Sequence, residues 1–96
     1  MSVAELQLIN KVLTDKDFAL IEDNAITAEH LPQVKKEFEY IRDFYDEYKD
    51  IPDKLTFAEK FPDFEYIDVN QPIKAVIDDL REQALFRRAV KIINDS

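Results

Sequence analysis

The stretch PQVKKEFEYIRDFYDEYKD, residues 32–50, combines an apolar stripe with a charged one. Its large apolar residues recur at steps of four, three, four and three, which gathers them on one face of an α-helix. The opposite face is rich in charge and predicts contact with water. We therefore expect this helix to organise the core, with Pro32 in its first turn. The apolar face consists of Val34, Phe38, Ile41, Tyr45 and Tyr48, widened by Phe44.

The composition of the 96-residue chain predicts one helical domain. Hydrophobic residues make up 46% of the sequence and include seven Phe and four Tyr, which suffices for one modest core. The absence of cysteine excludes disulfides and cysteine-ligated zinc. The absence of glycine excludes a phosphate-binding glycine loop and disfavours tight β-hairpins. Without glycine, we expect the helices to end at Asn, Asp or Pro.

Charge and hydropathy bear on where the chain acts and what it binds. No apolar run approaches eighteen residues and the N-terminus lacks a signal-peptide pattern, which predicts a cytoplasmic protein that does not enter membranes. The net charge of −8 predicts no direct binding to nucleic acid, because the phosphates would be repelled. One segment is locally basic, with Arg81, Arg87, Arg88 and Lys91 against Glu82 alone.

The N-terminal third of the chain contains two further helical signals. Residues 2–14 are predicted to form a core-packing helix that opens with a capping box of Ser2 and Glu5. Residues 16–23 are predicted to form a short helix. Thr27 is a candidate cap for the turn that precedes the central stretch.

The middle of the chain completes the bundle. Thr56 and Glu59 match a second capping box, which opens a short helix that stops before the next proline. Residues 63–70 are predicted to form an extended loop, because a single strand would have no partner. The sequence therefore predicts a single all-α domain over residues 1–96, a small orthogonal bundle of about five helices with a long C-terminal helix. Residues 1–70 form the bundle, and residues 71–96 form the long helix.

Residues 71–94 form the longest predicted helix, with Asn70 as its cap and an apolar stripe that changes face halfway along. Two interpretations stay open. Either the outer half packs on a partner, or the segment is one long core helix with frayed ends. The first face holds Ile73, Val76, Ile77, Leu80 and Ala84, and the second face holds Leu85, Phe86, Ala89, Ile92 and Ile93.

No catalytic arrangement is visible in the sequence, so we expect a chain that is not an enzyme and needs no cofactor. The single histidine, His30, has no recognisable nucleophile motif beside it and suits a hydrogen-bonded polar role. The carboxylates of Asp43, Asp46, Glu47 and Asp50 lie at helical spacing and suit a hard cation in principle. They lack the glycine and the alternating donors of a calcium loop, which favours a solvated acidic face.

Several short segments, taken in chain order, follow the pattern of a known family. They resemble motifs of the N-terminal domain of DnaB-type replicative helicases, in particular the divergent versions of bacteriophages, and the resemblance covers essentially the whole chain. The sequence departs from that pattern at Gln7 and Asp50, where family members often carry glycine. The matching segments are Ala4-Glu5-Leu6 with Leu13-Thr14-Asp15, His30 with Phe38-Glu39-Tyr40-Ile41, Tyr48-Lys49-Asp50-Ile51-Pro52-Asp53-Lys54-Leu55-Thr56-Phe57, Phe61-Pro62-Asp63-Phe64, and Leu80-Arg81-Glu82-Gln83-Ala84 with Arg87-Arg88.

The resemblance implies a helical bundle followed by a helical hairpin that pairs with a neighbouring subunit. In that family the domain forms a collar on a hexameric ring and contacts primase or helicase-loader proteins, while the ATPase is a separate domain with a P-loop. It implies here a non-catalytic domain for oligomerisation and for docking primase or a loader in DNA replication. The expected interface is the outer part of the last helix: Leu85, Phe86, Arg87, Arg88, Ile92 and Ile93. The arginines are expected to pair with carboxylates of the partner.

Two other functions compete with this one. A small acidic phage regulatory protein would bind a basic site on a host or replication protein through its acidic face, and its binding would weaken with salt. A hydrolase dependent on a divalent metal would use Asp43, Asp46 and Glu47, and would bind Mg²⁺ or Mn²⁺.

Overall fold

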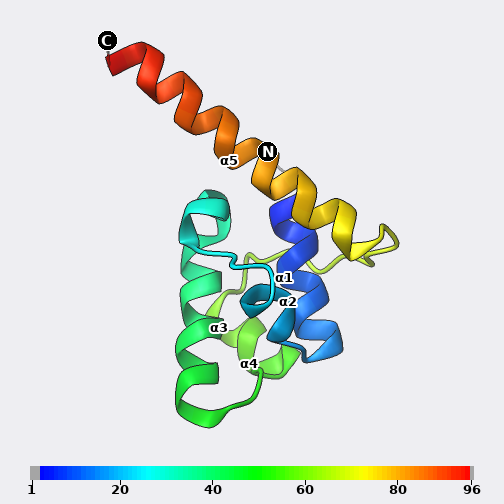
Figure 1. Ribbon diagram of the computed structural model, residues 1–96. Helices are drawn as coiled ribbons and strands as arrows, with labels where there is room; N and C mark the ends of the chain where they lie inside the picture. Colours follow the sequence, from blue (N-terminus) through cyan, green and yellow to red (C-terminus); the bar gives the residue numbers. More distant parts are fainter. Residues whose placement is uncertain (1–2, 96) are drawn as a thin grey trace.

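The structure is a computed structural model that describes the backbone of residues 3–95 and the side chains of residues 3–89. The described part contains five α-helices and two 3-10 turns, and no strand (Figure 1). The predicted all-α class and the long last helix are confirmed. In chain order the elements are α1 (Val3–Asp15), α2 (Ala19–Glu22), η1 (Ala28–His30), η2 (Pro32–Val34), α3 (Lys35–Tyr48), α4 (Lys54–Lys60) and α5 (Ile73–Asp95).

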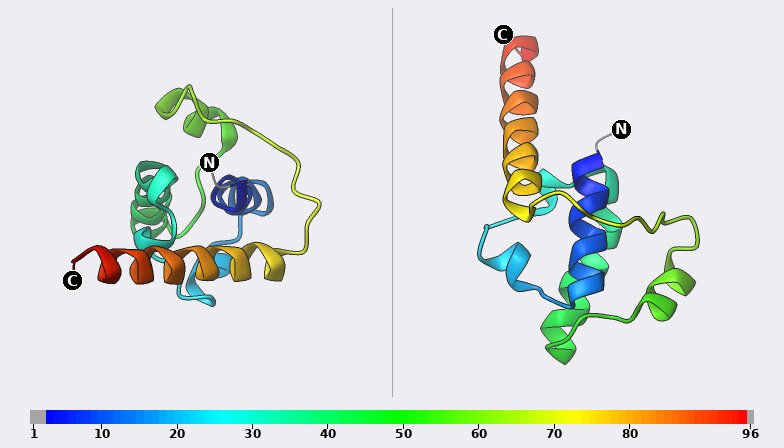
Figure 2. Two further views of the ribbon diagram at one scale, coloured as in Figure 1. Left: turned by 90° about the horizontal axis from the view of Figure 1, so that it is seen from above. Right: turned by 90° about the vertical axis from the view of Figure 1, so that its right-hand side faces the viewer.

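Helix α1 lies at the centre of the bundle, with α3, α4 and α5 around it when the molecule is seen from above (Figure 2). Its Leu8, Ile9 and Val12 are completely buried, as are Phe57 of α4 and Leu80 of α5. The sequence pattern pointed to residues 32–50 as the organiser of the core. The structure gives that place to α1, because α1 is the helix enclosed on several sides.

The buried face of α3 is narrower than the predicted stripe. Phe38 and Ile41 are buried, and Tyr45 is half-buried with its ring stacked on Phe18 at a centroid distance of 4.4 Å. Tyr48, expected on the same face, is 59% exposed. The C-terminal end of α3 extends below α1 in Figure 1, so its last turn has less of the bundle to pack against.

Three positions next to helix ends take the left-handed conformation in this glycine-free chain. Lys16, Ala25 and Lys49 have φ values of 51°, 52° and 55°. A side chain at such a φ crowds the backbone carbonyl and costs roughly 1–2 kcal/mol. We expected Asn or Asp at helix ends, and Lys and Ala occupy these three positions instead.

The capping predictions have mixed outcomes. The cap at Thr27 is confirmed: its backbone N–H donates to Nδ1 of His30 at 3.1 Å, which also gives His30 the polar role expected for it. The predicted box of Thr56 and Glu59 is wrong. Helix α4 begins two residues before Thr56, and Asp53 caps it by accepting the Thr56 N–H at 2.7 Å. This hydrogen bond lowers the pKa of Asp53 below its usual value.

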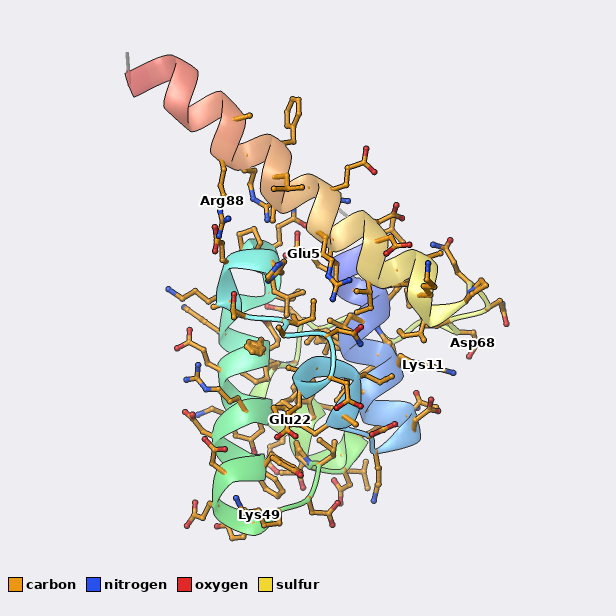
Figure 3. All side chains as sticks on the ribbon, in the orientation of Figure 1. Glu5, Lys11, Glu22, Lys49, Asp68 and Arg88 are labelled. Carbon is orange, nitrogen blue, oxygen red and sulfur yellow. The ribbon has the colours of Figure 1, made fainter. Side chains whose placement is uncertain are left out.

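Glu5 ties α1 to η2. Its carboxylate is almost completely buried, and Oε1 accepts the backbone N–H of Gln33 at 2.8 Å. Figure 3 shows Glu5 near the N-terminal end of α1. We expected Glu5 to share a capping box with Ser2, which lies outside the described residues. The structure turns the carboxylate toward a distant turn, because η2 packs against this end of α1.

Asn10 ties α1 to the segment between α4 and α5. The amide is buried; its Nδ2 donates to the carbonyl oxygens of Leu6 and Glu65, and its Oδ1 accepts the N–H of Ile67. Residues 63–70 form no helix or strand, so the predicted extended loop is confirmed. One side chain on α1 therefore supplies hydrogen bonds that a neighbouring strand would otherwise supply.

We predict that Asn10→Ala lowers the free energy of unfolding by about 1–3 kcal/mol, because it leaves the Glu65 carbonyl and the Ile67 N–H without this partner. Urea denaturation measures the change. The matched control is Asn24→Ala, whose half-buried amide makes one local bond to the Leu20 carbonyl at 2.8 Å. If both substitutions lower the free energy of unfolding equally, the bonds of Asn10 to the loop do not stabilise the fold.

Candidate protein-docking surface

Helix α5 has an inner half that packs on the bundle and an outer half that leaves it. Val76, Ile77, Leu80 and Ala84 of the inner half are buried, as their spacing predicted. α5 lies against α1 and η1. Beyond this contact the helix extends past every other element (Figures 1 and 2). We call residues 85–95 the α5 arm.

The α5 arm exposes large apolar side chains at its base. Leu85 is 64% exposed, Phe86 is 69% exposed, and Ala89 is exposed as well. The arm remains helical through Asp95, but Ile92 and Ile93, also expected at the interface, lie outside the described side chains. The docking interpretation requires Leu85 and Phe86 to be accessible, and both are.

Four other large apolar residues are exposed in the described part of the chain: Val3, Tyr48, Leu55 and Tyr66. They lie on α1, α3, α4 and the loop before α5, one to each element. Leu85 and Phe86 differ because they are adjacent in sequence and lie where the helix leaves the bundle. Isolated exposed apolar residues are normal on a protein surface, so it is the position of Leu85 and Phe86, where the helix leaves the bundle, that makes this segment a candidate contact site.

Arginine side chains fasten α5 to the segment that contains η1. Arg88 donates from Nε and Nη2 to the two carboxylate oxygens of Glu29, a bidentate ion pair. Arg87 donates to the carbonyl oxygen of Glu29, and Arg81 to that of Asn24, both at 2.9 Å. We expected Arg87 and Arg88 to pair with carboxylates of a partner. In the structure both make contacts within the chain, because η1 lies beneath the start of the arm.

This ion pair shifts the pKa values of both of its members. The hydrogen bond from Arg88 lowers the pKa of Glu29 below its usual value, and the same contact raises the pKa of Arg88. Both groups are exposed to water, so the pair is screened by salt. Its main structural effect is on the direction of α5, because it holds the base of the α5 arm to η1. Phe86, two residues earlier, stays exposed.

The structure lends no support to a metal site on α3. Among the described residues, no group of three or more His, Asp or Glu side chains is placed to hold a metal ion. Asp43, Asp46, Glu47 and Asp50 are exposed, and Asp43 pairs with Arg42 at 3.3 Å. No described helix is both long and apolar enough to cross a membrane.

Comparisons with known proteins give no further identification. No protein-family model matches the chain. No curated protein and no solved structure matches it either.

We predict that Glu29→Gln makes the stability of the protein less sensitive to acid. The pKa of Glu29 is lower in the folded chain than its usual 4.5, so the stability from its ion pair is present above that value and is lost as pH falls through the folded pKa. Urea midpoints measured from roughly pH 3 to pH 7 test this. Glu47→Gln is the control, since exposed Glu47 has no ion pair among the described residues. Equal acid sensitivity in the two variants would contradict the prediction.

Proposed function

We propose that this chain is a non-catalytic oligomerisation and docking domain of a phage-type replicative DNA helicase. The observation that carries the proposal is the exposed pair Leu85 and Phe86 on a helix that extends past the bundle. Burying a large apolar side chain contributes roughly 1.5–3 kcal/mol, which favours association over exposure. The α5 arm is therefore the surface through which the chain contacts a protein partner.

The side chains at the base of the arm support association. Leu85 and Phe86 are both exposed there, and large apolar side chains of this kind form the centre of protein interfaces. Aromatic side chains near the centre of an interface contribute most of its affinity, and charged groups at the rim contribute little. We assign Phe86 as the central contact, with Leu85 beside it and the arginines at the edge.

The assignment to a helicase rests on the motifs that resemble the DnaB-type N-terminal domain. In that family the motor is a separate domain with a P-loop, and the glycine-free sequence here carries none. The α5 arm then corresponds to the start of the hairpin that pairs neighbouring subunits. The proposed partners are further copies of the chain and a primase or helicase loader, in the cytoplasm.

A second candidate is a regulatory protein that occupies a basic site on another replication or host protein. The observation in its favour is the net charge of −8, together with the exposed carboxylates of Asp43, Asp46 and Glu47 on α3. Such binding would collapse as salt rises and would not depend on Phe86.

We predict that Phe86→Asp weakens self-association by at least about 30-fold, because it places a charge at the centre of the apolar contact. Analytical ultracentrifugation over a range of concentrations measures the change, and circular dichroism checks that helicity is unchanged. The control is Leu55→Asp, the same kind of substitution at a residue that is 84% exposed on α4.

The controls separate the outcomes. Loss of association in Phe86→Asp with normal association in Leu55→Asp supports the α5 arm as the interface. Unchanged association in Phe86→Asp overturns the proposal. Equal losses in both variants also contradict it, because they would indicate unspecific association of exposed apolar residues.

A further inference from the structure

A hollow with an apolar floor and an acidic rim opens between α1, η2, the start of α3 and the segment after α4. Its volume is about 430 Å³. The apolar part of its lining comes from Leu6, Val34, Phe61 and Phe64, each of which is half-buried. The hollow is thus an apolar site that the described side chains leave partly open. We call it the acidic-rimmed hollow.

The walls of this hollow are held in place from α1. Glu5 binds the backbone of Gln33 on one wall, and Asn10 binds the backbone of Glu65 on the other. Phe61 and Phe64 both pack against the buried ring of Phe57, each with a centroid distance of 5.0 Å. A site that is already formed binds with a smaller entropic cost than one that must be ordered by its partner.

The rim of the hollow selects a basic occupant. Glu37, Asp63 and Glu65 line it, with Lys60 as the one basic residue in the lining. A matching occupant carries a large apolar side chain next to cationic groups, because the apolar part fills the floor while the cations meet the rim.

The chain itself carries such a segment. In the α5 arm, Phe86 follows Leu85 and is followed directly by Arg87 and Arg88. Phe86 does not line the hollow of its own chain, so an arm that fills the hollow would come from another copy. The side chain of Arg88 is 61% exposed, and its guanidinium has more N–H donors than its two bonds to Glu29 use.

We propose that the α5 arm of one copy inserts Phe86 into the acidic-rimmed hollow of a second copy. The inference rests on the proposed function and names the surface that receives the arm. Pairing of two arms with each other is less favourable, because it brings Arg87, Arg88 and Lys91 of both copies together. The contact joins two different surfaces of the protein. A closed assembly therefore forms only if two copies exchange their arms reciprocally or if several copies form a ring.

Cross-linking tests the contact directly, because the chain has no cysteine of its own. An Ala89→Cys chain is mixed with a Lys60→Cys chain under mild oxidation, and the dimer is followed on a non-reducing gel. The control partner is Lys54→Cys, the same substitution at the other end of α4. We expect the 89–60 cross-link to form at least roughly tenfold faster than the 89–54 cross-link, because docking raises the local concentration.

A complementation experiment gives a second measurement. Phe86→Asp removes the inserted side chain, and the double variant Glu37→Lys and Glu65→Lys reverses the rim. Alone, Phe86→Asp should associate at least about 30-fold more weakly than the native chain and the rim variant at least roughly tenfold more weakly. Their mixture should form a heterodimer from one intact arm and one intact hollow. The control double variant, Glu22→Lys and Glu47→Lys, makes the same change in charge at exposed positions outside the hollow and should associate normally.

The outcomes distinguish this inference from the function on which it rests. Preferential 89–60 cross-linking and restored association in the mixture support insertion. Faster cross-linking of Ala89→Cys with itself, or normal association of the rim variant, overturns insertion and leaves arm-to-arm pairing as the mode of association. If Phe86→Asp alone associates normally, the proposed function fails as well.

Discussion

The inner half of α5 lies against α1, and this contact decides which surfaces of the protein remain free. Val76 and Leu80 are completely buried there, and each fully buried aliphatic residue of this kind contributes roughly 1.5–3 kcal/mol. Because the helix is continuous, fixing its inner half also fixes the path of its outer half. The ion pair of Arg88 and Glu29 adds a second point of attachment. Beyond these contacts the backbone of α5 extends past the other elements (Figure 1).

The elements that were predictable from the sequence are those with a regular apolar period. The inner face of α5 and the Phe38–Ile41 part of α3 are buried as their spacing indicates. Periodicity does not say where the neighbouring helix ends, which is why Tyr48 was placed on the wrong side of the boundary between core and surface. It also does not show which helix is enclosed by the others.

The roles of the polar residues that hold the walls of the hollow and the base of the α5 arm were not predicted from the sequence. Glu5 and Asn10 were not recognised as buried, and the pairing of Glu29 with Arg88 joins residues far apart in the chain. Gln7, Lys11, Thr14 and Asp15 form a polar face of α1 that meets water, whereas Glu5 and Asn10 lie among its apolar positions. The contacts themselves depend on η2 and the 63–70 loop, whose positions no local pattern specifies.

The bonds of Asn10 have a consequence for the order in which the protein forms during synthesis. The amide belongs to α1, which leaves the ribosome before its partners Glu65 and Ile67, because they follow more than fifty residues later in the chain. Until they emerge, Oδ1 of Asn10 lacks its Ile67 partner, Nδ2 has only the Leu6 carbonyl within α1, and the contact between α1 and α5 has yet to form. The nascent chain therefore completes its fold late, and the surfaces by which one copy would recognise another arise only when almost the whole domain has been made.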